Sequence, residues 1–226
     1  HWNRTVDPKT IEGFISQGVE NYVFDIADGT KVAKVSRYGN PDMKAPLSTL
    51  QEKQVEKIEA MEQVKGREGF EQLDEVIEIN PDLPAVLVCD KAPGTTLISL
   101  TPEELDNIPE DHMDKLIANV AFANQNNIQL DTAGAGNNVM YDPEKGFTII
   151  DFSSYQNTSQ FKMPPDPEMV RRYARQVLFD VIPSEKVPLP PAKITFYQSF
   201  KRAFGDEAAR WLKFDFSIWH TIPEDL

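Results

Sequence analysis

The chain has 226 residues, of which 40% are hydrophobic and 26% are charged, and its formal net charge is −13. Nucleic-acid binding needs clustered Lys and Arg to neutralise phosphates, so this charge argues against nucleic acid as a main partner. A cationic ligand is compatible with the same charge. Because no apolar run approaches the length that spans a bilayer, no membrane partner is expected.

Cys89 is the only cysteine of the chain. No internal disulfide is therefore expected, and the chain suits a reducing compartment such as the cytoplasm. The surrounding run 85–89 is apolar, which indicates a buried structural thiol rather than a nucleophile. Because the sequence starts with His1 rather than Met, we expect it to have been trimmed, and whether it is a fragment of a longer protein stays open.

Strand patterns dominate the first part of the chain. The predicted elements are strands at 22–26 and 31–35, a helix from Ser48 to about Gly66, and strands near 75–79 and 85–89. The first two strands flank the turn signal Asp28-Gly29, which predicts a β-hairpin. The helix is expected to begin with a capping box at Ser48.

Helical patterns predominate from residue 102 onward. The predicted elements are helices at 102–127, 168–180 and 196–212, a strand at 147–150, and a proline-rich connection at 183–191. The aromatic residues of segment 211–219 are expected to pack on the core. The change of pattern predicts an N-terminal lobe of residues 1–90 and a C-terminal lobe of residues 91–226, with a hinge at about 90–94.

Two acids and two amides gather around the strand predicted at 147–150. Asp131 precedes a loop of small residues, Asn137 and Asn138 end that loop, and Asp151 follows the strand. An acid at the end of a buried strand must be solvated, paired or bound to a cation. The pattern is compatible with a metal and phosphate site, although the same residues also cap turns.

Lys34 and Gly18 are the candidate phosphate-binding residues of the first part. Lys34 lies among apolar neighbours of a predicted strand, where it either extends to solvent or points inward toward a carboxylate or a phosphate. Gly18 directly precedes the first strand, and glycine allows backbone N–H groups to approach a ligand closely.

The order of these segments resembles that of the protein-kinase-like superfamily, and most closely its branch of aminoglycoside phosphotransferases and other small-molecule kinases. The similar segments are a reduced glycine-rich loop at 18–24, the strand with the phosphate-pairing lysine at 32–34, the hinge at 87–94, the catalytic loop at 131–138 and the metal-binding segment at 149–153. The resemblance covers roughly residues 13–155.

The resemblance implies a two-lobed α+β fold, with an N-terminal antiparallel sheet plus one helix and a helical C-terminal lobe. It also implies a phosphotransferase that uses ATP and Mg²⁺ and acts on a hydroxyl of a small molecule. Asp131 would be the catalytic base. Asn138 and Asp151 would bind Mg²⁺, with Asn137 as the alternative to Asn138.

The same resemblance assigns the nucleotide contacts. Lys34 would bind the α- and β-phosphates beneath the loop that holds Gly18, and the backbone of Asp90 and Ala92 would meet the adenine. The carboxylate that pairs with the lysine would be Glu52, with Glu56 as the alternative.

Three departures from the family pattern bear on function. Gln129-Leu-Asp131 stands in place of His-Arg-Asp, and Ser153 replaces the glycine of the metal-binding segment. Asn138 follows Asp131 by seven residues, where the family pattern has five. These features disfavour a phosphorylation-regulated protein kinase. The alternatives are a pseudokinase that binds nucleotide or a protein partner without turnover, and an atypical protein kinase.

Overall fold

The structure is a computed structural model, and its chain divides into two compact units. It describes residues 7–18, 20–38, 46–130, 136–154, 167–168, 170–171 and 186–226. The first unit runs to Arg67 and includes Glu71–Ala92, whereas the second contains Glu68–Phe70 and everything from Pro93 onward. The division after Ala92 falls within the segment 90–94 that was predicted as the hinge.

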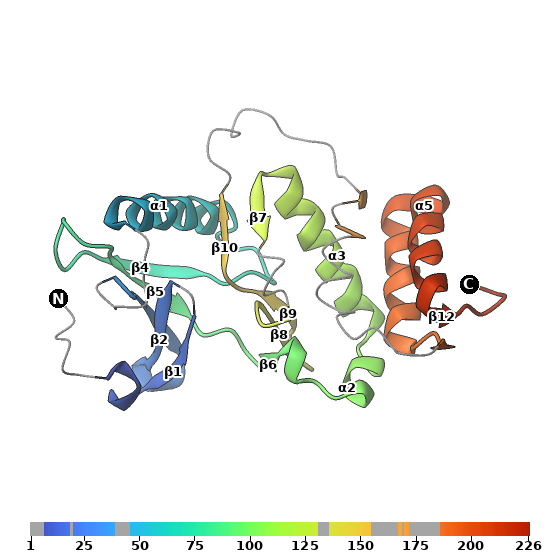
Figure 1. The fold of residues 1–226 in the computed structure, drawn as a ribbon, viewed down its shortest axis with the longest axis horizontal. Coiled ribbons are helices and arrows are strands. Elements are labelled where there is room, and N and C mark those ends of the chain that lie inside the picture. The colour runs from blue at the N-terminus through green and yellow to red at the C-terminus, as the bar shows by residue number, and fades with distance from the viewer. Residues whose placement is uncertain are drawn as a thin grey trace. The chain divides into compact units, whose positions relative to one another are not determined.

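The first unit is an antiparallel five-stranded sheet with one long helix (Figure 1). The strand order is β1-β2-β3-β5-β4. The bounds are β1 (Phe14–Gln17), β2 (Asn21–Ile26), β3 (Lys31–Ser36), α1 (Leu47–Gln63), β4 (Leu73–Ile77) and β5 (Val86–Asp90). This confirms the predicted N-terminal antiparallel sheet with one helix. It also confirms the β2–β3 hairpin, in which Tyr22 pairs with Val35 and Phe24 with Ala33.

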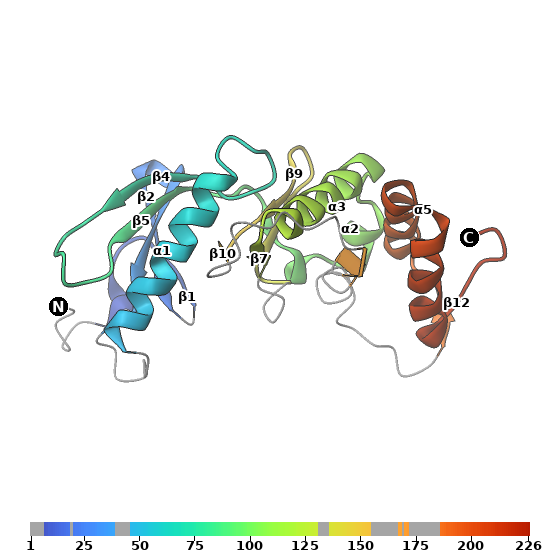
Figure 2. The same ribbon diagram turned by 90° about the horizontal axis from the view of Figure 1, so that it is seen from above.

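Helix α1 begins differently from the prediction and lies along the sheet of the first unit (Figure 2). Its N-cap is Pro46, without a side-chain cap, so Ser48 is already helical and the predicted capping box is absent. The amide of Gln54 binds both backbone groups of Ala85, with 2.7 Å for each hydrogen bond. This pair fixes the helix to the chain that leads into β5.

The second unit combines helices with short strands. Its elements are β6 (Thr95–Thr96), α2 (Pro102–Asp106), α3 (Glu110–Gln125), β7 (Ile128–Leu130), β8 (Val139–Asp142), β9 (Gly146–Ile149), β10 (Phe152–Ser154), β11 (Val187–Pro188), α5 (Pro191–Trp219) and β12 (His220–Thr221). Strands β6, β8 and β9 form one sheet, β7 pairs with β10, and β11 pairs with β12. The strand predicted at 147–150 is β9.

Two helix predictions for the second unit need correction. The helix predicted at 102–127 is broken into α2 and α3, because Pro109 is extended and serves as the N-cap of α3. The final helix is longer than predicted and is interrupted at Gly205, whose φ is 83°. Most of the helix predicted at 168–180 lies outside the described residues.

Helices α3 and α5 share the core of the second unit. Fully buried side chains of both helices are Met113 and Ile117 of α3 and Phe196, Phe200 and Leu212 of α5. At the rim, Arg202 donates to the carboxylate of Asp114 over 2.8 Å, which links the two helices by an ion pair.

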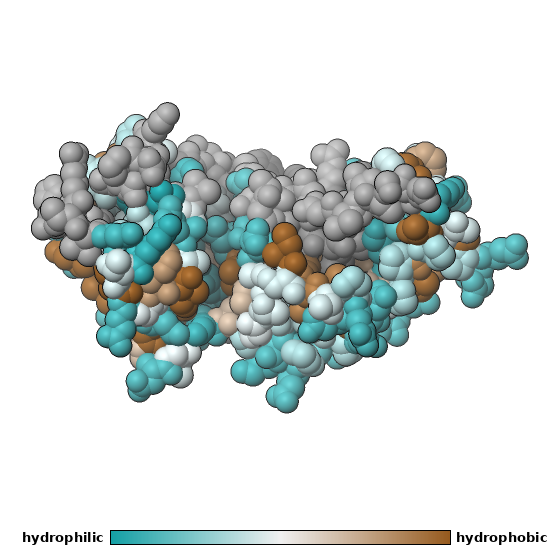
Figure 3. All heavy atoms as spheres, turned by 60° about the horizontal axis from the view of Figure 1, so that its bottom comes forward, coloured by the Kyte–Doolittle hydropathy of each residue, from teal (hydrophilic) through white to brown (hydrophobic). Residues whose placement is uncertain are grey.

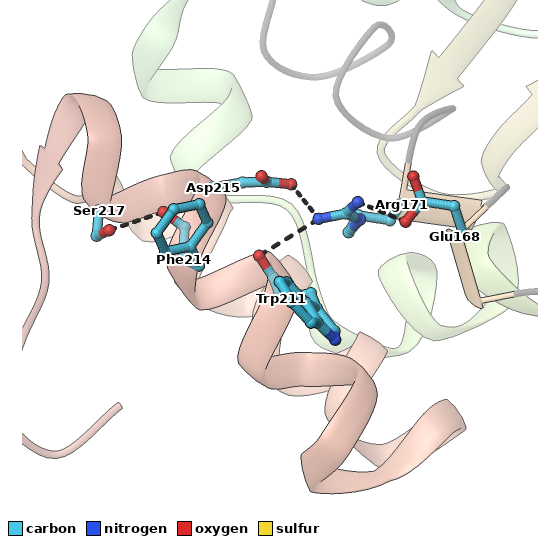
Figure 4. A network of polar contacts seen from close by, with 6 residues as sticks. All are labelled: Glu168, Arg171, Trp211, Phe214, Asp215 and Ser217. Atoms are coloured by element: carbon cyan, nitrogen blue, oxygen red, sulfur yellow. Dashed lines mark hydrogen bonds and ion pairs between the residues drawn. The ribbon is translucent and has the colours of Figure 1, made fainter.

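The aromatic residues near the end of α5 are only partly buried. Phe216 is 4% exposed, but Trp211, Phe214 and Trp219 are 61%, 60% and 42% exposed, so the expected packing on the core is wrong for these three residues. A polar contact holds this turn instead (Figure 4): Arg171 donates to Asp215 over 2.7 Å and pairs with Glu168.

Among the coloured residues of Figure 3, hydrophilic ones predominate and hydrophobic ones lie in small groups. None of the helices within the described ranges is both long enough and apolar enough to cross a membrane.

Candidate functional site

Lys34 points inward in the sheet of the first unit. It lies on β3, opposite Val23 of β2 and Leu87 of β5. Its Nζ atom is 2.6 Å from Oε2 of Glu71, and the side chains of the two residues are 13% and 3% exposed. Of the two orientations that the sequence left open, the structure has the inward one, with a carboxylate as the anionic partner.

Glu71 takes the place that was predicted for Glu52 or Glu56. Glu52 is exposed and Glu56 is half-buried on α1. Glu71 lies in the connection between α1 and β4, where neither a helical nor a strand period identifies an inward position. The only local signal is an acid that directly follows Phe70, which is too weak to predict an ion pair.

Cys89 is buried next to this ion pair, and its thiol is unreactive. It is fully buried and lies opposite Val32 in the sheet. Burial, followed by the negative charge of Glu71, raises the pKa of its thiol to about 12. The thiol therefore stays protonated, which confirms the expectation of a structural cysteine rather than a nucleophile.

Gly18 forms the turn between β1 and β2. Its N–H donates to the carbonyl of Asn21 over 2.9 Å, and its own carbonyl accepts from Arg37 over 2.9 Å. A Cβ atom at Gly18 would lie 3.6 Å from the Asn21 oxygen, an ordinary contact, and φ is not in the left-handed region. The fold itself therefore does not require glycine here, and the ligand role of Gly18 stays a prediction.

Two backbone N–H groups at the end of β5 are already hydrogen-bonded within the first unit. The N–H of Asp90 donates to Gln72 and that of Lys91 donates to Thr30, each over 3.0 Å. An adenine at this segment would have to use the carbonyl of Asp90 and the backbone of Ala92. That contact also stays a prediction.

Asn138 and Asp151 lie at the same end of the β8–β9 hairpin. Val139 pairs with Ile149, and the N–H of Ile150 donates to the carbonyl of Asn138 over 2.8 Å. Asn138 and Asp151 are half-buried, whereas Asn137 is exposed. The pairing therefore brings together the two residues that were predicted to bind a metal.

The backbone of Asp151 is in the left-handed region, with φ at 57°. Few residues other than glycine adopt this conformation, and Asp and Asn are among those that tolerate it best. The turn at Asp151 leads directly into β10, whose Phe152 pairs with Leu130 of β7. A left-handed turn thus connects β9 with β10, and β10 pairs with β7, the strand that precedes the predicted catalytic loop.

Asp131 lies outside the described residues, which stop at Leu130 and resume at Gly136. Within the described ranges, no group of three or more His, Cys, Asp and Glu side chains is arranged to hold a metal. The two candidate donors at this end of the hairpin are one amide, of Asn138, and one carboxylate, of Asp151. Mg²⁺ often takes only one or two protein oxygens and completes its shell with phosphate and water, so this donor set fits Mg²⁺.

Comparison with protein-family models and with curated protein sequences finds no match. The resemblance to small-molecule kinases therefore rests on the order of the motifs in the sequence.

Proposed function

We propose that the protein is a phosphotransferase of the kinase-like type, which uses ATP and Mg²⁺ to phosphorylate a hydroxyl of a small molecule. The observation that carries this proposal is the joining of Asn138 and Asp151 at one end of the β8–β9 hairpin, with Asp151 in a left-handed turn. Two hard oxygen donors held in this way suit a metal that is bound together with phosphates.

The arrangement of the first unit supports the same proposal. A lysine on the middle strand of an antiparallel sheet is buried against an acid, and a helix follows that strand in the chain. A buried lysine held by a carboxylate keeps its charge, as a phosphate-binding group must. The two-lobed kinase-like fold is therefore our proposal for the whole chain.

The roles follow from the chemistry of phosphoryl transfer. Lys34 would bind the α- and β-phosphates of ATP below the turn at Gly18. Asp131 would accept the proton of the acceptor hydroxyl while the new O–P bond forms and the bond to ADP breaks. Asn138 and Asp151 would hold Mg²⁺, which neutralises charge on the phosphates when it is bound.

The acceptor is a hydroxyl-bearing small molecule, and the net charge of −13 is compatible with a cationic one. We propose neither nucleic acid nor membrane as a partner. The single buried thiol Cys89 suits the reducing cytoplasm as the location.

A nucleotide-binding pseudokinase is the second candidate. It is favoured by Gln129-Leu-Asp131 in place of His-Arg-Asp and by Ser153 in place of glycine. A protein acceptor, as in an atypical protein kinase, is a third candidate. In an enzyme, Asp131→Asn should abolish the turnover of ATP with an acceptor and leave nucleotide binding intact. This result would distinguish an enzyme from the pseudokinase.

The first test is the thermal shift produced by ATP, with and without Mg²⁺. Ligand at about 100 times its dissociation constant should stabilise by roughly 2.7 kcal/mol, which is about 5–10 °C for a chain of this size. We expect a Mg²⁺-dependent shift that Asp151→Asn abolishes. The matched control is Glu144→Gln, which removes one exposed charge from the turn of the same hairpin and should leave the shift intact.

No shift with any nucleotide would contradict the proposed function. A shift that does not depend on Mg²⁺ would favour the pseudokinase.

A further inference from the structure

The acid that pairs with Lys34 is more deeply buried than the lysine itself. The side chain of Glu71 is 3% exposed, and that of Lys34 is 13% exposed. A carboxylate buried to this degree needs a cation or hydrogen-bond donors to stay charged. The 2.6 Å contact with Lys34 supplies the cation.

The chain holds Glu71 through its neighbour Gln72. The Gln72 side chain accepts from the N–H of Gly66 over 2.7 Å and donates to the carbonyl of Arg67 over 3.2 Å. The backbone carbonyl of Gln72 accepts from the N–H of Asp90 over 3.0 Å. Glu71 is thus tied to the segment after α1 and to the end of β5, rather than carried on a helix.

Helix α1 makes a different ionic contact. Lys53 and Lys57, four residues apart and therefore on one face of the helix, reach the two carboxylate oxygens of Glu20 over 2.5 and 3.2 Å. Glu20 lies between β1 and β2, next to the turn at Gly18. Lysines of α1 therefore pair with an acid of the β1–β2 connection. In a protein kinase, an acid of the corresponding helix pairs with the phosphate-binding lysine instead.

We propose that Glu71 is the positioning residue for Lys34, and that α1 instead holds the β1–β2 turn through Glu20. This inference rests on the proposed function of Lys34 as a phosphate-binding group. In protein kinases the lysine's acid is carried on a helix whose position is regulated. Here the acid belongs to the α1–β4 connection rather than to α1 itself, so the orientation of Lys34 does not require an acid carried on a helix.

The test compares the affinities for ATP and for adenosine, because only ATP needs the oriented lysine. Glu71→Gln should weaken the affinity for ATP at least about 10-fold. The affinity for adenosine should stay within about twofold, since the adenine contacts do not involve the ion pair. Glu52→Gln is the matched control, an exposed acid of α1 that should change neither affinity. In a Lys34→Met background, Glu71→Gln should have no further effect on ATP affinity.

Equal weakening of ATP and adenosine by Glu71→Gln would overturn the inference, because it would indicate a structural role. If Glu71→Gln changes neither affinity while Asp151→Asn abolishes the Mg²⁺-dependent shift, the inference fails and the proposed function stands. If the native chain binds no ATP, the proposed function itself fails. Should Glu71→Gln not fold, Glu71→Asp keeps the charge with a shorter reach and should weaken ATP alone.

Discussion

The two units hold their candidate ligand-binding residues in different ways. In the first, Lys34 and Glu71 form a buried ion pair, with side chains 13% and 3% exposed. In the second, a backbone hydrogen bond from Ile150 joins Asn138 to the segment of Asp151, and the turn at Asp151 is left-handed. A side-chain ion pair couples the site to the stability of its unit, whereas a backbone contact persists when the side chains change.

The largest expected effect breaks the buried pair of the first unit. Lys34→Met or Glu71→Leu alone breaks the buried ion pair and should lower the free energy of unfolding by about 3–5 kcal/mol. The double variant should lose less than either single variant, because no buried charge remains. Urea denaturation measures all three. Single variants within about 1 kcal/mol of the native chain would show that water or another group compensates the remaining charge.

Two glycine substitutions, one in each unit, test how strongly the backbone of each unit constrains the candidate site. Gly94 of the second unit has φ at +81°, and a Cβ atom there would lie 1.9 Å from the carbonyl oxygen of Tyr141. Gly94→Ala should therefore destabilise by about 2–4 kcal/mol, from strain and overpacking together. Gly18→Ala of the first unit is the control, with an expected change within about 0.5 kcal/mol. Similar losses for both, measured by denaturation, would refute the difference.

The sequence predicted the regular parts of both units from local patterns. The β2–β3 hairpin followed from alternation around Asp28-Gly29, and both residues do adopt positive φ. The break at Pro109 was missed because the apolar positions that predicted the helix, from Leu116 to Phe122, all lie after it. Glu71 was missed for a stronger reason: it lies outside any helix or strand, and its burial comes from contacts that are distant in sequence.

The arrangement of the two predicted metal-binding residues was likewise only partly predictable from the sequence. The resemblance selected Asn138 and Asp151, but only the strand register shows that the Ile150 N–H joins their segments. The left-handed backbone of Asp151 has no signature in the sequence, since Asp occurs in ordinary turns as well.

A half-buried lysine of the second unit sharpens the contrast with Lys34. Lys193 of α5 lies 2.8 Å from Nε2 of His220, and burial lowers the pKa of its ammonium group to about 8. Because the unfolded chain holds this proton up to the ordinary lysine pKa of 10.5, it binds more protons than the folded chain between about pH 8 and 10.5. Stability contributed by this residue should therefore rise with pH across that window.

Lys193→Met should remove this rise, since the group no longer titrates. Denaturation of the native and variant chains at pH 7.5, 9 and 10 measures the difference, and the subtraction cancels other groups that titrate in this range. A difference that does not change with pH would show that Lys193 is solvated.

Asp151→Gly separates stability from function in the second unit. Glycine adopts φ at 57° without strain, so the backbone of the turn should tolerate the change and the free energy of unfolding should stay within about 1 kcal/mol of the native value. It should also lose the Mg²⁺-dependent shift with ATP, because the carboxylate is gone. A clear loss of stability would mean that contacts of the Asp151 side chain, rather than its backbone, hold the turn.

The smallest expected effect concerns Glu20 and the lysines of α1. Burial raises the pKa of Glu20, but Lys57 and Lys53 outweigh it and lower the pKa below the ordinary glutamate value of 4.5. The folded chain therefore releases this proton more readily than the unfolded chain, and the pair stabilises above about pH 4.5. That contribution is lost as the pH falls through the lowered pKa.

Because the Lys53 side chain is 51% exposed, Glu20→Gln should cost only about 0.2–1 kcal/mol at pH 7. The difference from the native chain should shrink as the pH falls through the lowered pKa of Glu20, because the carboxylate is then lost in the folded chain as well. Urea denaturation at a series of pH values below about 7 measures this decline. If the difference does not change with pH, packing rather than the ion pair holds the contact between α1 and the β1–β2 connection.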